Sequence, residues 1–161
     1  MAKRSKRNKT VKGRPDTDSG KQVRQSADAG RADHLTIAWR LSRFDWDGPW
    51  GTGAFEGQTF EEVIQGWCCE FERQTWAEAF RAGGGRRRGN NNHPVRSENL
   101  TKQAKDRLNE LNLEEYDTLY SFRLTSTLRV YGIRDSRAFE ALWFDPWHGD
   151  NEKAVYPTQK R

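Results

Sequence analysis

The chain has 161 residues, with 28 Lys/Arg against 23 Asp/Glu and a formal net charge of +5. This length fits a single domain with a modest core, to which the seven Trp contribute bulky apolar groups. No stretch approaches the apolar length of a membrane span, and the N-terminal segment lacks the apolar region of a secretory signal. We therefore expect a soluble cytoplasmic protein.

The positive charge is concentrated in the N-terminal segment. Residues 1–33 carry ten Lys/Arg against four Asp, a net charge of +6, whereas residues 34–161 have a net charge of −1. Because this segment has few large apolar residues, we predict a disordered basic tail over 1–33 and one domain over 34–161. A basic arm attracts phosphate backbones through charge alone, although a solubilising extension would have the same composition. The candidate nucleic-acid-binding residues of the tail are Lys3, Arg4, Lys6, Arg7 and Lys9.

The domain is expected to open with a strand and a loop. Apolar residues alternate through 35–44, which predicts a strand, and the Gly-rich segment 45–53 predicts a turn-rich loop. Three Trp lie close together in the sequence here: Trp39, Trp46 and Trp50. They form either a packing cluster that fixes the loop or a platform on which bases stack.

Two helices are expected next. Thr59 and Glu62 have the spacing of a capping box, and apolar residues then recur at helical spacing, which predicts a helix over 59–81. The glycine-rich, polar segment 82–93 predicts a flexible loop. A second helix should begin near Asn99 or Thr101 and end near Asn112. In the predicted loop over 82–93, the candidate nucleic-acid contacts are Arg86, Arg87 and Arg88.

Residues 120–148 are predicted to form a three-stranded antiparallel meander. Period-two alternation puts Phe122 on a core face together with its neighbours two residues away. A three-residue loop at 125–127 then places Phe122 opposite Val130, and a two-residue turn at 135–136 places Val130 opposite Ala141. Runs of helix followed by strand predict an α+β fold, with two helices on one face of a mostly antiparallel four-stranded sheet.

The same register puts polar residues on the other face of the meander. Arg123 lies beside Arg129, and Tyr131 lies beside Glu140. Because like charges placed opposite each other cost stability, either Glu140 neutralises them or the face binds an anion. An ordinary solvated sheet face is the alternative interpretation.

Motifs for several common chemistries do not occur in the sequence. It has no P-loop spacing, no GxSxG, no HExxH and no cysteine-based zinc pattern, so we expect neither a metal nor a cofactor. The adjacent Cys68 and Cys69 do not form a CxxC site and would not pair easily with each other.

The candidate chemistry is metal-independent RNA cleavage. His148 directly follows the last predicted strand and could donate or accept a proton, while Glu140 could serve as a base. Tyr131 or Tyr156 could donate or orient, and arginines bind phosphate oxygens. These groups match the requirements of RNA cleavage, namely a base for the 2′-hydroxyl, cations for the developing charge and an acid for the leaving oxygen.

The order of strand, two helices and three-stranded meander resembles the RelE/ParE superfamily of toxin–antitoxin toxins over roughly residues 35–157. The residues that carry the resemblance are R-V-Y-G-I-R-D from Arg129, F-E-A-L-W-F-D-P-W-H from Phe139, and V-Y at Val155. The stretches D-G-P-W-G and L-W-F-D-P-W-H also look like those of small uncharacterised bacterial proteins.

The resemblance implies an mRNA endoribonuclease toxin that acts on RNA or ribosome-bound mRNA and is held inactive by an antitoxin protein. It implies phosphate binding by Arg123 and Arg129, acid or base roles for Glu140 or His148, and a stacking or catalytic role for Tyr156. The alternative is a non-catalytic accessory module that binds nucleic acid or protein through the same face and the basic tail.

Overall fold

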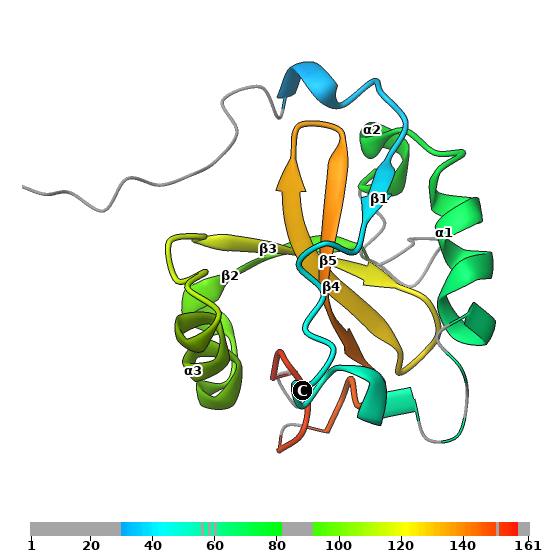
Figure 1. Ribbon diagram of the computed structural model, residues 1–161. Coiled ribbons are helices and arrows are strands. Elements are labelled where there is room, and N and C mark those ends of the chain that lie inside the picture. The colour runs from blue at the N-terminus through cyan, green and yellow to red at the C-terminus, as the bar shows by residue number, and fades with distance from the viewer. Residues whose placement is uncertain are drawn as a thin grey trace, which may run out of the picture.

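The computed structural model describes residues 30–55, 57, 59, 61–81, 92–150 and 152–157. Its centre is a five-stranded sheet in the order β1-β5-β4-β3-β2, with helices on both sides (Figure 1). β1 runs parallel to β5, and the other three pairings are antiparallel. The α+β class is confirmed, but the predicted four-stranded sheet is wrong by one strand. The strands are β1 (Ala38–Arg40), β2 (His93–Arg96), β3 (Thr118–Arg123), β4 (Arg129–Asp135) and β5 (Ala138–Asp145).

β2 is the strand that the sequence did not predict. His93, expected at the end of the flexible loop, pairs with Ser121, and Arg96 pairs with Thr118. The strand is short, lies at the edge of the sheet and contains Pro94, so it gives a weak sequence signal. Loop residues 82–91, with the three adjacent arginines, lie outside the described residues, as does the tail over 1–29 with its basic candidates.

The predicted helix over 59–81 is divided into several parts. A π-helical segment, Glu61–Gln65, leads into α1 (Gly66–Phe71), and α2 (Trp76–Ala79) follows. The predicted capping box is confirmed, since the Glu62 amide donates to Thr59 Oγ1 at 3.2 Å and the Thr59 amide donates to Glu62 Oε2 at 2.8 Å. A second capping box, formed by Thr75 and Glu78, starts α2 and divides the helix.

α3 (Lys102–Glu110) is close to the second predicted helix. The Thr101 hydroxyl accepts a hydrogen bond from the Ala104 amide at the start of the helix. Asn112 has a φ of 55°, a left-handed conformation that Asn tolerates and that prevents continuation of the helix. No helix in the described part of the chain is long and apolar enough to cross a membrane.

Helices cover both faces of the sheet, so the prediction of two helices on one face is wrong. α1 and α2 lie on one side and α3 lies on the other (Figure 1). All eight residues of β5 are buried, and a strand with apolar residues on both faces requires two covering layers. Buried residues on the α1/α2 side include Phe71, Trp76, Phe122, Val130, Phe139 and Phe144. Buried residues on the α3 side include Leu108, Leu119, Ile133, Leu142 and Trp143.

The three neighbouring tryptophans do not form one packing cluster. Trp39 packs with the core on the α1/α2 side, whereas Trp50 is buried in the core on the α3 side. Trp46 is exposed and lies with its ring centroid 4.7 Å from that of Phe44. Trp39 and Trp50 therefore pack into the core on opposite faces of the sheet.

The register of the meander is confirmed in its first hairpin and wrong in its second. Phe122 lies opposite Val130, as expected. In the second hairpin, Val130 pairs with Phe144 instead of Ala141, because the turn lies one residue later and a β-bulge follows it. The bulge leaves Leu142 between two paired residues, so both Leu142 and Trp143 lie in the core on the α3 side.

Gly132 beside the bulge is required by close packing. A Cβ atom at this position would lie 2.3 Å from the carbonyl oxygen of Glu140 and 2.6 Å from the Phe139 ring. The backbone of β4 therefore approaches β5 too closely for any side chain.

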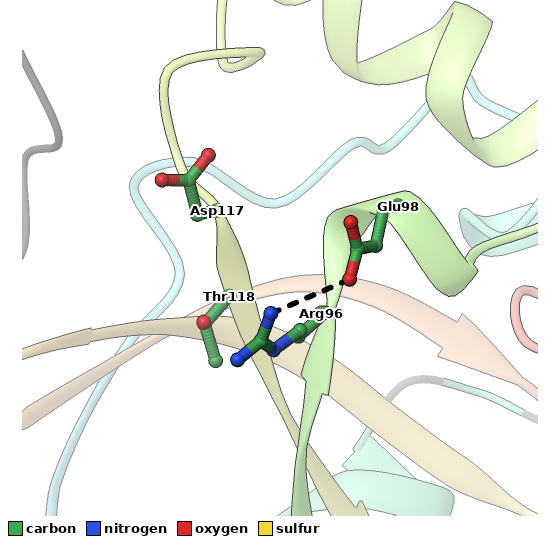
Figure 2. A pocket seen from close by; sticks show the side chains of 4 residues that line it. All are labelled: Arg96, Glu98, Asp117 and Thr118. Atoms are coloured by element: carbon green, nitrogen blue, oxygen red, sulfur yellow. Dashed lines mark hydrogen bonds and ion pairs between the residues drawn. The ribbon is translucent and has the colours of Figure 1, made fainter.

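A shallow polar pocket lies at the end of the β2–β3 pair where Arg96 is opposite Thr118. Figure 2 shows Arg96 turned toward Glu98, to which its guanidinium is paired at 3.5 Å. The pocket has a volume of about 400 Å³. Its lining residues are Arg96, Glu98, Asp117 and Thr118.

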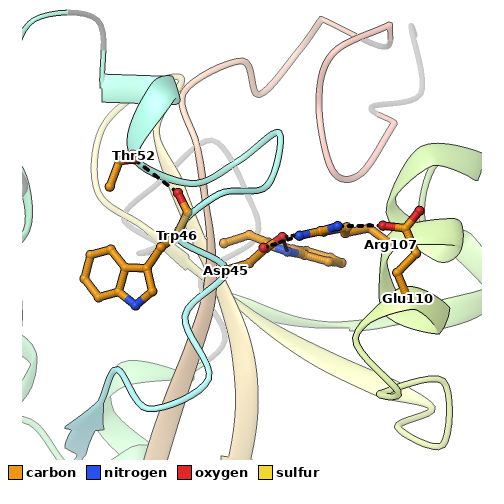
Figure 3. A network of polar contacts seen from close by, with 6 residues as sticks. Asp45, Trp46, Thr52, Arg107 and Glu110 are labelled. Carbon is orange, nitrogen blue, oxygen red and sulfur yellow. Dashed lines mark hydrogen bonds and ion pairs between the residues drawn. The ribbon is translucent and has the colours of Figure 1, made fainter.

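A buried ion pair fastens α3 to the loop that follows β1. Arg107 Nε and Nη2 donate to the two carboxylate oxygens of Asp45 at 2.8 and 2.6 Å, and Arg107 Nη1 also pairs with Glu110 (Figure 3). Trp143 of β5 donates its indole N–H to Asp45 at 3.1 Å. The Asp45 side chain is 3% exposed, so its charge depends on these donors.

Asp45→Ala should lower the free energy of unfolding by about 2–4 kcal/mol, because it leaves Arg107 without its buried partner and the Trp143 indole without an acceptor. Urea unfolding measures the change. The matched control is Asp106→Ala, which removes the exposed Lys102–Asp106 pair and should cost less than about 0.5 kcal/mol. Equal losses for the two variants would contradict the importance of the buried pair.

Candidate functional site

Polar side chains gather at one end of the sheet, where β3 and β5 finish and β4 and β2 begin. Arg129 lies opposite Arg123 on one side and opposite Asp145 on the other. Two residues before Arg123 on the same strand, Ser121 lies between His93 of β2 and Tyr131 of β4. Residues directly opposite one another share a face, so these side chains all lie on the α3 side. Two residues from the segment that follows β5, His148 and Tyr156, complete the group. We call it the sheet-end cluster, and its members are His93, Ser121, Arg123, Arg129, Tyr131, Asp145, His148 and Tyr156.

Asp145 positions the segment that follows β5. Its carboxylate oxygens accept hydrogen bonds from the backbone amides of Trp147 at 2.8 Å and Val155 at 2.9 Å. The buried Val155 in turn accepts at its carbonyl from the Thr101 amide at the start of α3. The segment is therefore held across the sheet end at two points, the amides of Trp147 and Val155.

This held segment brings His148 and Tyr156 to the cluster. The His148 amide donates to the carbonyl of Thr127, in the loop between β3 and β4, at 3.0 Å. The Tyr156 ring lies edge-on to the His93 ring, with 6.0 Å between the centroids. Both side chains are half-buried, as are those of His93 and Arg123, so the cluster is accessible on this side.

The two arginines share one backbone acceptor. Arg123 Nε and Arg129 Nη1 both donate to the carbonyl of Thr125, at 3.0 and 2.7 Å, and Arg129 Nη1 also donates to the Leu128 carbonyl. Burial lowers the pKa of Arg129, and the nearby Arg123 adds to this shift, while Tyr131 and Asp145 oppose it. Two guanidinium groups therefore lie side by side at this end of the sheet.

His148 is held in its neutral form by this environment. Burial lowers the pKa of His148 to about 4, and the positive charges of Arg129, His93 and Arg123 contribute to the same direction. A neutral imidazole at neutral pH can accept a proton.

Two buried polar atoms of the cluster, Arg129 Nε and His148 Nδ1, have no hydrogen-bond partner among the described residues. Buried polar groups are normally paired, so this concentration indicates space for water or for a polar ligand. Burial also raises the pKa of Tyr131, an effect that the Ser121 side chain partly offsets, so the phenol remains a potential donor.

Five of the six residues that the sequence singled out for catalysis lie in this cluster, and Glu140 does not. Glu140 pairs with Ile133 instead of lying beside Tyr131, because of the later turn of the second hairpin. Its carboxylate is paired with Arg43 at 2.6 Å and Arg40 at 3.4 Å. The five residues in the cluster are Arg123, Arg129, Tyr131, His148 and Tyr156.

Sequence reasoning missed His93 and Asp145. An Asp before Pro at the end of a buried run is typical of a turn, and that signal could have identified Asp145 as the residue that anchors the next segment. His93 had no comparable signal, because its place depends on pairing with Ser121.

Other reactive groups lie outside the cluster. Burial raises the pKa of the Cys68 thiol to about 12, with Glu72 and Cys69 adding to the shift, so this thiol is a poor nucleophile. Both cysteines are free. In the described ranges, no group of three or more His, Cys, Asp or Glu side chains could hold a metal ion.

His148→Gln should change how stability depends on pH. The pKa of His148 is about 4 in the folded chain and its ordinary value is 6.5, so the unfolded state binds more protons between these values. The His148 contribution to the free energy of unfolding therefore rises from pH 4 to pH 7 and is lost as the pH falls. After allowance for solvent screening, the excess of wild type over the variant should grow by about 1–2 kcal/mol across this range. Urea unfolding at several pH values measures it, and a constant difference would contradict the neutral state of His148.

Asp145→Asn should reveal a pH dependence of opposite sign. Burial raises the pKa of Asp145 to about 6 from its ordinary value of 3.8, although the Val155 and Trp147 amides oppose the shift. The contribution of Asp145 is thus fully present below about pH 4 and is lost as the pH rises through 6. The wild type should lose about 2–3 kcal/mol relative to the variant over this range. If the free energy of unfolding of wild type instead rose with pH relative to that of the variant, the carboxylate would be ionised more easily in the folded chain.

Comparison with known proteins gives no assignment. No known protein family matches the chain, and no match was found among curated proteins or solved structures. The RelE/ParE resemblance therefore remains a hypothesis, and the functional argument depends on the geometry of the sheet-end cluster.

Proposed function

We propose that this protein acts on RNA and that the sheet-end cluster binds and cleaves a phosphodiester group. The observation that carries the proposal is the convergence of Arg123, Arg129, His93 and His148 at one accessible end of the sheet, beside buried polar atoms that have no partner among the described residues. The closest functional description is an mRNA endoribonuclease toxin of the RelE type.

Charge explains the binding step. Arg123 and Arg129 lie opposite each other and repel, and their shared carbonyl acceptor is neutral. A phosphate group between them would convert this repulsion into two charge-assisted interactions. The unpartnered Arg129 Nε would supply a donor on the inner side of the site.

The proton chemistry of RNA cleavage fits the same residues. The neutral His148 accepts the proton of the attacking 2′-hydroxyl, and the arginines stabilise the charge that develops on phosphorus. Tyr131 is fully buried, so it orients or donates from behind and does not contact the sugar. The ring of Tyr156, against that of His93, supplies an aromatic surface for a base.

The resemblance adds support to this proposal. The roles that it implies for Arg123, Arg129, His148 and Tyr156 all fall within one cluster. On this basis the substrate is mRNA, free or on the ribosome, and an antitoxin protein would inhibit the toxin.

A non-catalytic binding module is the second candidate. It is favoured by the use of Arg129 Nη1 to hold two backbone carbonyls, which is a structural role. A binding module requires positive charge and no particular proton donor or acceptor. Binding through several phosphate contacts would then weaken steeply with added salt.

Inducible expression in a bacterial host should arrest growth, and purified protein should cleave RNA, alone or on ribosomes. His148→Ala should lower the cleavage rate by about 100-fold or more, because the proton acceptor is lost. Arg123→Ala should weaken RNA binding as well as cleavage. Growth curves, cleavage assays and binding titrations measure these effects, and circular dichroism checks that each variant is folded.

Arg96→Ala is the matched control, since this exposed arginine lies at the opposite end of the β2–β3 pair. It should leave growth arrest and cleavage unchanged. RNA binding that depends on Arg123, without cleavage, would favour the binding module. If the protein neither binds nor cleaves RNA, both candidates fail.

A further inference from the structure

We infer that His93 and His148 act as an acid–base pair, with His148 taking the proton of the 2′-hydroxyl and His93 giving a proton to the leaving 5′-oxygen. This inference rests on the proposed RNA cleavage and makes it more specific. It assigns a catalytic role to His93 and restricts the substrate to RNA with a free 2′-hydroxyl at the cut.

The fold fixes the position of His93 from several directions. It is the first residue of β2 and shares a face with Ser121 and Tyr131. The preceding residue, the buried Asn92, accepts a hydrogen bond from the Arg123 amide at 2.8 Å and donates to the Ala79 carbonyl at 2.9 Å. His93 is thus held beside the arginine that faces the solvent side of the cluster, and its own side chain is half-buried.

The imidazole of His93 has one nitrogen engaged and the other available for the reaction. Nδ1 lies 3.2 Å from the Pro94 carbonyl oxygen, and a carbonyl can only accept, so Nδ1 carries the hydrogen of this bond. A proton that is transferred must then be on Nε2. The Tyr156 ring packs edge-on against the imidazole and limits its rotation.

The two histidines reach the same end of the sheet from different segments. The charge of His93 disfavours protonation of His148, together with the charges of Arg129 and Arg123. His93 is fixed by its pairing with Ser121, two residues before the end of β3. Acid–base catalysis requires one imidazole that carries the proton to be donated and one that is free to accept a proton. His148 is fixed from another side by its backbone bond to Thr127, so the two rings come from different segments.

Other candidates for the proton donor are less suitable. Glu140 is paired with Arg40 and Arg43 outside the cluster. The two carboxylate oxygens of Asp145 are occupied by backbone amides, and Tyr131 is fully buried. The half-buried His93 has an imidazole that can donate a proton from its ring nitrogen.

The reaction balances without another reagent. The 2′-oxygen forms a bond to phosphorus as its proton passes to His148, and the bond from phosphorus to the 5′-oxygen breaks as that oxygen takes the proton of His93. Arg123 and Arg129 hold the non-bridging oxygens throughout. The products are a 2′,3′-cyclic phosphate and a 5′-hydroxyl, and exchange with water returns both histidines to their starting states.

The test uses His93→Gln and two RNA oligonucleotides that differ in one atom. One has the natural 5′-oxygen at the cleavage site, and the other has sulfur there, which leaves as a thiolate without a proton. His93→Gln should cleave the oxygen substrate about 100-fold more slowly or worse and should cleave the sulfur substrate nearly as fast as wild type. His148→Gln should be slow on both substrates, because its role precedes departure of the leaving group.

His34→Gln is the matched control, since this exposed histidine lies outside the cluster, and it should cleave both substrates like wild type. If His93→Gln slows both substrates equally, or neither, the role of His93 as the acid is overturned while RNA cleavage stands. If wild type cleaves neither substrate, alone or on ribosomes, the proposed function fails and this inference fails with it. Binding of 2′-O-methyl RNA, measured separately, should stay within about threefold of wild type for His93→Gln.

Discussion

Burial of both faces of β5 is the constraint on which the rest of the structure depends. Apolar side chains project from both sides of this strand, so a single layer of helices cannot cover it. The second layer must also be fixed in orientation, and the ion pair between Asp45 and Arg107 does this by joining α3 to the loop that follows β1. The Trp143 indole connects β5 itself to the same carboxylate. Core packing and one buried charge together determine where α3 lies.

The sheet-end cluster contains groups that destabilise the fold, whereas the core does not. Arg129 is 4% exposed and lies opposite a second arginine, and buried polar atoms around it lack partners among the described residues. Desolvated like charges destabilise a fold, so such an arrangement is more typical of a binding or catalytic site than of a structural one. Asp145 both reduces this cost and holds the segment that carries His148. The same residue thus supports the stability of the sheet end and the geometry of the candidate site.

Local patterns in the sequence predicted what depends on local physics. Alternation and a short loop determine the pairing of Phe122 with Val130, and side-chain capping determines the start of α3. The second hairpin could not be predicted, because the bulge at Leu142 shifts the parity of β5 and depends on packing around Gly132. The candidate site was predicted only in part, because some of its residues are placed by local patterns and others by pairing between distant segments. The arginines follow the first hairpin, whereas the place of His93 depends on a strand pairing that leaves little trace in the sequence.

The parallel pairing of β1 with β5 also determines the order in which the sheet can assemble. Ala38 pairs with Ala138, about one hundred residues later, so this contact closes a long loop, whereas the β3–β4 and β4–β5 hairpins close short ones. During synthesis β1 emerges first but has no partner until β5 has left the ribosome. Once β5 has emerged and until β1 docks, β5, the most apolar strand of the sheet, has an unpaired edge. The chain therefore passes through a stage in which its most apolar strand is open to pairing with other chains, and the docking of β1 removes that hazard.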